Sequence, residues 1–319
     1  MNPPLYSIIL PTYNRAAMLR AAIRSVLAQT FESWECFVID DGSTDSTPGV
    51  FEEFKRHPRL RLHRFEDNKR QHVRRNFAIN MAHGEWVAFL DSDDLWLPRR
   101  LEAFAEAARL RPAADFWFCN AYRVEQDRVV ALQFDPNLPL PEGQVPGWYA
   151  VGDRFLPYLT STLSIRKSLF DRHGKFREDM QVQEDTELYA RMLAAGHRVG
   201  VLREPLAVKR AHEWRSVHDF SVDFAETLVA LQSGGAPPEV LSKAERALAL
   251  ELSAYFIRGL YPGNVHDFMR HHVTDRGPAY WRVLLLSLVP RFVLRAAKAL
   301  RGLWIRLRYP PLETLGLQP

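Results

Sequence analysis

The sequence predicts an α/β fold in which a mostly parallel sheet is flanked by helices and followed by a helical C-terminal region. Short apolar runs typical of strands alternate with helical patterns over the first hundred residues. Three of these runs end in polar residues, which parallel strands bring together at the carboxyl edge of a sheet. From residue 219 to residue 273 the pattern is mainly helical.

The first strand is expected at residues 6–10, where an apolar run stops at Pro11. A helix should follow it, with Asn14 as a plausible N-cap. Its apolar face has helical spacing and consists of Leu19, Ile23, Val26 and Leu27. Further strands are predicted at residues 34–39, 60–65 and 86–90, and further helices at residues 75–82, at residues 98–109, and from about Thr186 to Gly196.

Composition limits the class of protein. A chain of 319 residues with 47% hydrophobic residues can bury a sizeable core, which argues against a disordered or fibrous chain. Cys36 and Cys119 lie in apolar runs and suggest neither a disulfide framework nor a zinc site. The first residues lack the pattern of a secretory signal, so we expect a cytoplasmic protein.

Basic residues are concentrated near the C-terminus. The formal net charge is +4, but residues 276–312 contain eight Arg and Lys and no acidic residue, which leaves −4 for the remainder. The main domain is therefore not expected to bind nucleic acid.

Two carboxylates, Asp91 and Asp93, leave the end of a buried strand in the phrase FLDSDD. In extended backbone they point to the same side, so they can hold one hard cation, Mg²⁺ or Mn²⁺. Such an ion neutralises the charge that builds on a departing diphosphate. The alternative is a solvated acidic turn that caps the next helix.

Five segments follow one another along the chain: SIILPTYNR, VIDDGSTDST, RRNFAI, HGEWVAFLDSDD and QEDTELYARM. Their order and approximate spacing, over about residues 5–216, resemble the bacterial, non-processive family 2 glycosyltransferases. The resemblance implies a Rossmann-like GT-A fold for a catalytic domain at residues 1–216. Residues 217–319 would then form a helical C-terminal region with a basic amphipathic tail at about residues 280–308.

The resemblance also implies a site for a nucleotide-sugar donor, formed by Pro11, Thr12, Tyr13, Arg15, Asp41, Arg75, Asp91 and Ser92. In it the Tyr13 ring lies beside the base, Asp41 accepts a hydrogen bond from a pyrimidine N–H, and Arg75 contacts the base or a phosphate. A UDP-sugar is the first choice, although thymidine would satisfy the same contacts. The alternatives are turn formation by Asp40 and Asp41, and a surface ion pair for Arg75.

By the same resemblance Asp185 is the catalytic base, and Asp93 and Asp91 are the metal ligands. The chemistry requires a carboxylate that takes the proton of the attacking hydroxyl, and one displacement with one base gives inversion. The alternative for Asp185 is an N-cap of the helix that follows. Glu184 is expected to contact the acceptor or orient the base, and Ser161 falls where relatives contact the acceptor.

Arg210 and His212, followed by Ser216, resemble the family's Arg-x-His…Ser ending, where the His can approach the metal and the Arg the diphosphate. Trp214 and Arg215 stand where a small residue is more usual. His212 is therefore either a metal ligand or a simple loop histidine.

The tail pattern predicts an amphipathic helix from Arg291 onward, because apolar Phe292, Ala296, Ala299, Leu303 and Leu307 share one face and basic residues lie largely on the other. Such a helix suits the anionic inner face of the plasma membrane and a lipid-linked acceptor. The alternative is packing of the same apolar stripe against the catalytic domain or a second subunit.

These expectations combine into an inverting, metal-dependent glycosyltransferase that acts on a lipid-linked or cell-surface polysaccharide precursor. A processive synthase is disfavoured, because neither membrane spans nor a Gln-x-x-Arg-Trp motif are found. A catalytically inert nucleotide-sugar-binding or membrane-scaffolding protein is disfavoured because the metal carboxylates and the base are all present.

Overall fold

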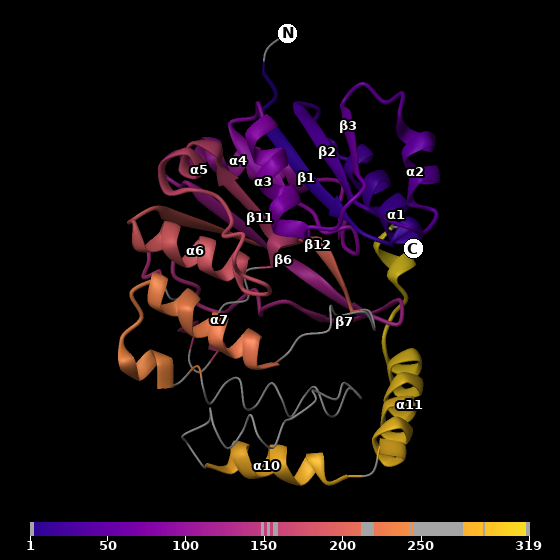
Figure 1. Cartoon of the computed structure of the whole chain (residues 1–319), viewed down its shortest axis with the longest axis vertical. Helices are drawn as coiled ribbons and strands as arrows, with labels where there is room; N and C mark the ends of the chain where they lie inside the picture. Colours follow the sequence, from indigo (N-terminus) through magenta and orange to yellow (C-terminus); the bar gives the residue numbers. More distant parts are fainter. Residues whose placement is uncertain are drawn as a thin grey trace.

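The computed structural model describes residues 3–147, 150–151, 154–155, 159–211, 220–242, 244, 277–289 and 291–316. Within these residues it is a mixed α/β fold, as predicted (Figure 1). Four parallel strands lie in the order β3-β2-β1-β4. They are β1 (Tyr6–Thr12), β2 (Trp34–Asp41), β3 (Leu60–Phe65) and β4 (Trp86–Phe89).

The same sheet continues beyond β4 with a change of direction. The next strand, β11 (Leu163–Arg166), is antiparallel to β4 and to β6 (Phe116–Glu125). The long strand β12 (Arg198–Ala211) runs parallel to β6 and antiparallel to the short β5 (Leu95–Trp96). The remaining short strands are β7 (Arg128–Leu132), β8 (Gly143–Gln144), β9 (Ala150–Val151) and β10 (Arg154–Phe155).

Helices cover the sheet and continue into the C-terminal region (Figure 1). The helices over the sheet are α1 (Ala16–Leu27), α2 (Thr47–Phe54), α3 (Gln71–Met81), α4 (Arg100–Leu110), α5 (Lys167–His173) and α6 (Glu184–Ala194). Those described after β12 are α7 (Phe220–Ser233), α10 (Pro278–Ser287) and α11 (Arg291–Arg308). Short 3₁₀ turns occupy Thr160–Thr162 and Leu312–Leu315. The domain boundary predicted after residue 216 lies outside the described residues and stays a prediction.

The start of α1 differs from the sequence prediction. Asn14 is not the N-cap, because the helix begins at Ala16 and Asn14 has a φ of 51°. Its side-chain oxygen instead accepts the backbone N–H of Thr44 at 2.8 Å and of Asp45 at 3.2 Å. The Asp45 carboxylate in turn accepts the N–H of Ala16 at 3.1 Å. A distant carboxylate therefore caps α1, which local sequence rules do not reveal.

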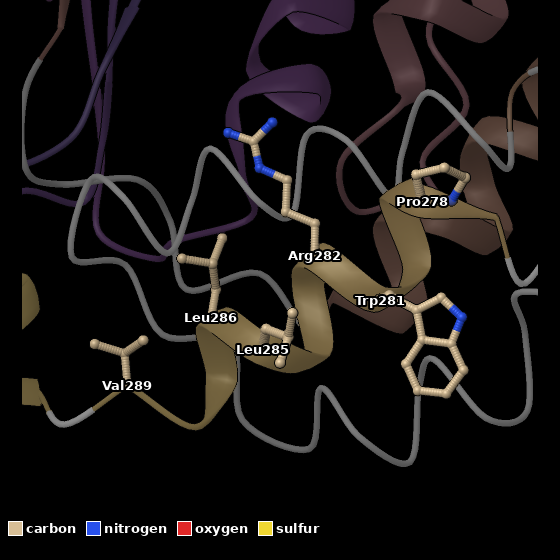
Figure 2. Close-up of a pocket in the computed structure, with 6 residues that line it drawn as sticks. All are labelled: Pro278, Trp281, Arg282, Leu285, Leu286 and Val289. Carbon is tan, nitrogen blue, oxygen red and sulfur yellow. The ribbon is translucent and has the colours of Figure 1, made fainter.

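The tail helix α11 contacts the β6–β7 turn through the side opposite to its apolar stripe. Gly302 and Ile305 are buried, and an added Cβ at Gly302 would lie 2.7 Å from the side chain of Gln126 in the β6–β7 turn. Leu303 and Leu307 are exposed, so packing of the predicted apolar stripe on this domain is wrong. On the preceding helix, α10, the side chains of Trp281 and Arg282 leave the helix in different directions (Figure 2). No helix among the described residues is long and apolar enough to cross a membrane.

After α11 the chain returns to the sheet domain near α1 (Figure 1). The N–H of Val129 donates to Pro310 at 3.0 Å, and the N–H of Leu312 donates to Asp127 at 2.8 Å. The side chain of Leu312 is buried against Leu95, Val124 and Val208. These contacts tie the last described residues to the β6–β7 hairpin.

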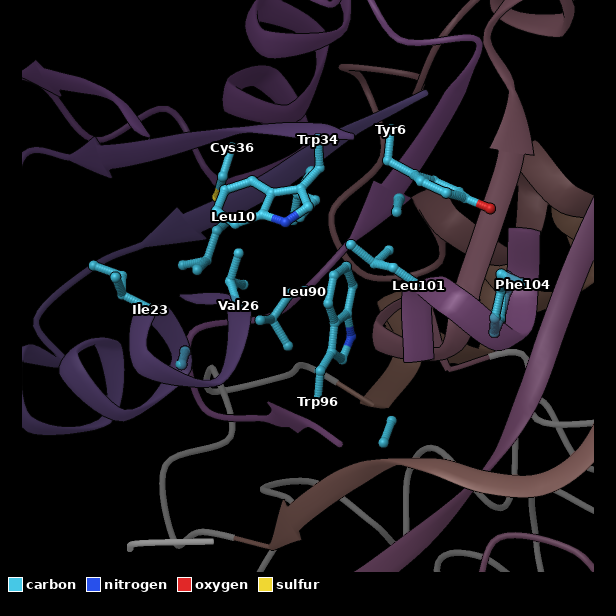
Figure 3. Close-up of a cluster of buried hydrophobic side chains, with 14 of the residues drawn as sticks. Tyr6, Leu10, Ile23, Val26, Trp34, Cys36, Leu90, Trp96, Leu101 and Phe104 are labelled. Atoms are coloured by element: carbon cyan, nitrogen blue, oxygen red, sulfur yellow. The ribbon is translucent and has the colours of Figure 1, made fainter. Parts of the chain in front are cut away.

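A continuous apolar core lies between the sheet and helices α1 and α4. Figure 3 shows Leu90 and Trp96 between Val26 on α1 and Leu101 on α4. All four side chains are buried, and Trp96 also donates its indole N–H to the carbonyl of Ser161 at 2.9 Å. This packing fixes the segment after β4, which carries the acidic motif.

Candidate active site

The carboxyl ends of β1, β2 and β4 border a pocket of about 370 Å³. Six of the predicted donor-binding residues line it: Pro11, Thr12, Tyr13, Arg15, Asp41 and Ser92. Residues that the sequence did not single out complete the lining: Asn68, Arg70, Gln71, His72, Gln181, Val182 and Val222. The Tyr13 side chain is 44% exposed, so an aromatic surface is accessible at the pocket.

Asp41 is held in place at this pocket by two donors. The Arg74 guanidinium contacts its carboxylate at 2.5 Å, and the backbone N–H of Lys69 donates to the same oxygen at 2.9 Å. Arg74 itself lies over the ring of Phe65 at 3.7 Å. The sequence prediction overlooked Arg74, although it is adjacent to Arg75 in the segment RRNFAI.

Arg75 on α3 joins the acidic motif to the start of α6. Its side chain is only 1% exposed and contacts Asp91 at 2.6 Å and Glu184 at 3.4 Å. Burial opposes the charge of Arg75, but these two carboxylates outweigh burial and raise the pKa of the guanidinium. A surface ion pair is therefore excluded. A direct contact between Arg75 and the nucleotide stays a prediction.

The acidic motif after β4 gathers three carboxylates. One oxygen from each of Asp91, Asp93 and Asp94 lies within 4.8 Å of the other two. A set of carboxylate oxygens with no sulfur or nitrogen ligand fits the preference of Mg²⁺ or Mn²⁺. In the structure Arg15 contacts Asp93 at 3.1 Å and Arg75 contacts Asp91, so cations already face this charge.

Asp94, which the sequence prediction did not include, supports the motif from below. Its buried carboxylate accepts hydrogen bonds from Lys209 at 3.0 Å, from the Ser161 hydroxyl at 2.5 Å and from the N–H of Arg210 at 3.2 Å. Burial raises the pKa of Asp94 to about 7. With its oxygens committed to these donors, Asp94 leaves Asp91 and Asp93 as the better metal ligands.

Ser161 is buried and forms hydrogen bonds within the protein. Its hydroxyl donates to Asp94 and accepts the backbone N–H of Asp91 at 3.1 Å. The side chain is buried, which disfavours the predicted contact with an acceptor. Ser161 therefore holds both ends of the acidic motif together.

Asp185 lies at the start of α6 and faces Thr160. The Thr160 hydroxyl donates to one carboxylate oxygen at 2.8 Å, and the N–H of Thr186 donates to the other at 2.7 Å. Asp185 is the second residue of α6 and not its N-cap, a position occupied by Gln183. Burial raises the pKa of Asp185, although Arg75 and the Thr160 hydrogen bond oppose the shift. A raised pKa makes this carboxylate a stronger proton acceptor than an ordinary aspartate.

Glu184 is buried behind Asp185. It accepts a hydrogen bond from Gln71 at 3.1 Å in addition to its contact with Arg75. Burial and the charge of Asp185 raise the pKa of Glu184 to about 7. Its burial disfavours direct contact with an acceptor, and its role in orienting Asp185 stays a prediction.

The segment before Asp185 is held by α7, which lies beside α6 (Figure 1). The Glu226 carboxylate accepts the consecutive backbone N–H groups of Gln181, Val182 and Gln183 at 2.7, 2.8 and 3.1 Å. Asp223 accepts a hydrogen bond from the Gln183 side chain at 2.6 Å. The sequence gives no local signal for these contacts, because each joins residues at least forty positions apart.

The end of β12 brings two cations to the acidic motif. Lys209 contacts Asp94, and the Arg210 guanidinium donates to the carbonyl of Asp93 at 2.5 Å. Arg210, which was predicted to approach a diphosphate, thus lies next to the acidic motif. His212 lies outside the described residues, and its role as a metal ligand stays a prediction.

Comparison with known proteins gives one family for this chain. The model of the family "Glycosyl transferase family 2" matches residues 7–173. The putative teichuronic acid biosynthesis glycosyltransferase TuaG of Bacillus subtilis is 37% identical over 125 residues, which are 39% of this chain and 49% of that protein. The Escherichia coli enzyme WfgD, a UDP-Glc:α-D-GlcNAc-diphosphoundecaprenol β-1,3-glucosyltransferase, is 43% identical over 102 residues, which are 32% of this chain and 40% of that protein. The chain thus spans half or less of the length of these two relatives.

A solved structure confirms the predicted fold. Residues 1–349 of S. aureus TarS, in complex with UDP-GlcNAc, superpose with a TM-score of 0.61 at 22% sequence identity. The match covers 92% of this chain and 87% of that one. The extent of this superposition identifies the fold as the GT-A type, in agreement with the sequence expectation.

Proposed function

Since this chain belongs to glycosyl transferase family 2, we propose that it transfers a sugar from a nucleoside-diphosphate donor to an acceptor hydroxyl, with inversion at the anomeric carbon. One observation carries the proposal: the 370 Å³ pocket at the sheet edge shares Arg15 with the carboxylate cluster, through the contact of Arg15 with Asp93. A pocket of this volume falls in the range of small-molecule sites. The donor can therefore place its nucleoside in the pocket and its diphosphate toward the acidic motif.

A UDP-sugar is the first choice of donor. The exposed Tyr13 ring offers a face on which a base can stack, and the fixed Asp41 carboxylate offers an acceptor for the N–H of a pyrimidine. The UDP-GlcNAc bound to TarS and the UDP-Glc named for WfgD support this choice.

Asp91 and Asp93 would hold a divalent cation, Mn²⁺ or Mg²⁺, since their oxygens converge and are hard ligands. When bound, the cation supplies positive charge for the departing diphosphate. Lys209 and Arg210 approach the same motif and add fixed positive charge near it.

Asp185 is the base of the proposed reaction. Its carboxylate takes the proton from the acceptor hydroxyl while that oxygen bonds to the anomeric carbon. The bond from this carbon to the diphosphate breaks, and the nucleoside diphosphate leaves with the electron pair. Thr160 and the N–H of Thr186 keep the carboxylate oriented for this transfer.

The acceptor is proposed to be a saccharide of a cell-surface polysaccharide precursor, carried on a lipid at the inner face of the cytoplasmic membrane. The support comes from the relatives, because WfgD is named for a diphosphoundecaprenol-linked acceptor and TuaG for teichuronic acid biosynthesis.

The first experiment screens UDP-, dTDP- and GDP-sugars by thermal shift with Mn²⁺ or with EDTA. A bound donor stabilises the folded chain by mass action, so a UDP-sugar should raise the melting temperature, and raise it more with Mn²⁺. The selected donor is then used to measure hydrolysis or transfer by the wild type and by Asp93→Asn.

We expect Asp93→Asn to lose metal-dependent turnover, whereas Asp171→Asn, at an exposed position on α5, should keep it. Donor binding without any turnover in the wild type would instead identify an inert nucleotide-sugar-binding protein. Full turnover in EDTA would remove the metal from the proposal.

A further inference from the structure

The tail helix α11 keeps one side against the protein. Arg301 contacts Glu125 at 2.7 Å, Gly302 approaches Gln126, and Ile305 is buried. The strap formed by residues 309–312 then fixes the end of the helix on the β6–β7 hairpin. The orientation of α11 around its own axis is thereby set.

The side of α11 that faces away from the hairpin is apolar and exposed. Its members recur at helical spacing and are Val293, Leu300, Leu303, Trp304 and Leu307. Leu307 is 81% exposed, although leucine is among the residues most often buried. The intervening Ala296 and Ala297 are exposed as well, which makes the strip continuous.

A second apolar strip lies on α10. Trp281, Leu285 and Leu288 are exposed, whereas Tyr280 and Val283 on the other side of the helix are buried. With Pro278, Leu286 and Val289, part of this strip borders a shallow hollow of about 490 Å³ (Figure 2). Figure 1 shows α10 and α11 at the end of the molecule away from the N-terminus. We call the two strips together the C-terminal apolar face.

The positive charges beside this face indicate the kind of surface that it binds. Arg282, Arg306 and Arg308 are exposed beside the two strips, and the sequence from residue 276 to residue 312 contains no Asp or Glu. Apolar residues with flanking cations complement a surface that is anionic outside and apolar beneath, which describes a bilayer with acidic phospholipids. A second copy of this chain fits less well, because it would bring the same exposed arginines into contact with one another.

We propose that the C-terminal apolar face docks on an anionic lipid surface. In this arrangement α10 and α11 lie in the interface, their Leu and Trp side chains enter the boundary between headgroups and acyl chains, and the arginines contact lipid phosphates. The proposal concerns membrane attachment and is independent of the transfer chemistry, which uses none of these residues.

The test uses the full chain and sedimentation with vesicles of phosphatidylglycerol and phosphatidylcholine, compared with pure phosphatidylcholine. We expect binding to the mixed vesicles, weaker binding at high salt, and little binding to the neutral ones. The substitution Leu307→Glu should weaken binding at least about tenfold, because it removes an inserted side chain and adds repulsion.

Leu110→Glu provides the matched control. Leu110 is a 70% exposed leucine on α4, so the change introduces the same charge outside the C-terminal apolar face and should leave binding within about twofold. Thermal unfolding of both variants establishes that they are folded. Sedimentation velocity in the absence of lipid measures self-association.

Three outcomes would overturn the proposal. They are an absence of binding to the mixed vesicles, equal binding of Leu307→Glu and Leu110→Glu, and a lipid-free dimer of the wild type that Leu307→Glu dissociates. The last outcome would assign the face to a second copy of the chain.

Discussion

The sheet edge buries charged side chains, whereas the C-terminal helices expose apolar ones. At the edge, charged groups such as Arg75, Asp94 and Glu184 are buried, and each contacts a partner of opposite charge or a hydrogen-bond donor. On α10 and α11, by contrast, leucines and tryptophans are exposed. Both arrangements cost free energy in an isolated chain, so both indicate a ligand or surface that the protein meets in use.

The difference lies in where the compensation comes from. The buried charges are compensated within the chain, and the same contacts fix the positions of Asp185 and the acidic motif. The exposed apolar side chains of α11 lie on the side that faces away from the β6–β7 hairpin, whereas Gly302 and Ile305 on the opposite side are buried. Substitutions at the edge should therefore alter turnover or folding, whereas substitutions on the face should alter neither in the absence of lipid.

The largest effect is expected from Asp185→Asn. Loss of the proton acceptor should lower kcat by ~10²–10⁴-fold, while the free energy of unfolding changes little. Turnover of a saturating donor and acceptor measures the first quantity, and chemical denaturation the second. The matched control is Asp179→Asn, an exposed aspartate before α6, which should keep the wild-type rate. A full rate in Asp185→Asn would refute the assignment of the base.

Arg75→Met should be the most destabilising change at the edge. It leaves Asp91 and Glu184 without their shared cation, and breaking a buried pair from one side costs about 3–5 kcal/mol of unfolding free energy. Urea denaturation in EDTA measures the loss. The control Arg24→Met removes an exposed partner of Glu53 and should cost less than about 1 kcal/mol. Equal losses of unfolding free energy in the two variants would contradict the expectation that breaking the buried ion pair costs more than breaking the exposed one.

Leu312→Ala examines how the tail is held. Its side chain is buried against Leu95, Val124 and Val208, so truncation should lower the free energy of unfolding by about 2–3 kcal/mol. Leu307→Ala, a truncation of the same size on the exposed side of α11, should change it by less than about 0.5 kcal/mol. If Leu307→Ala were as costly, the apolar face would already be covered within the protein.

The smallest effect is a pH dependence that arises from Glu184. Its pKa is raised to about 7 in the folded chain, above the ordinary value of 4.5, so the folded state binds more protons between these two values. Unfolding free energy should therefore fall as the pH rises from about 4.5 to about 7, by on the order of 2 kcal/mol. Glu184→Gln should flatten this part of the profile, and Glu106→Gln, on the exposed side of α4, should not. An unchanged profile in Glu184→Gln would contradict the assigned shift.

Much of the sheet edge was predictable from sequence because its signals are local. Apolar runs that end in Pro11, Asp41 and Asp91 mark both the strands and the polar residues at their ends. The order of parallel strands then brings these ends together, and six predicted residues line one pocket. The positions of these residues along the chain were sufficient to predict that they meet, because the arrangement of the parallel strands brings the strand ends together.

What the sequence did not reveal depends on contacts between distant residues. Asp94 is fixed by Ser161 and Lys209, which lie 67 and 115 positions away. The buried position of Ser161 agrees with these bonds, whereas the family resemblance placed it where relatives contact the acceptor. In α11, periodicity identified the apolar stripe but not that the opposite side would dock, which depends on the small volume of Gly302 beside Gln126.

The hydrogen bonds of Glu226 have a consequence for protein engineering. This glutamate belongs to α7, which follows the predicted catalytic domain, yet it binds three backbone N–H groups just before Asp185. A chimera with its junction after β12 would combine the proposed base of one enzyme with the α7 of another. Such hybrids should lose the order of the segment before Asp185, and with it the positions of Gln181 and Val182 in the pocket, unless the recipient sequence supplies a carboxylate at the position of Glu226.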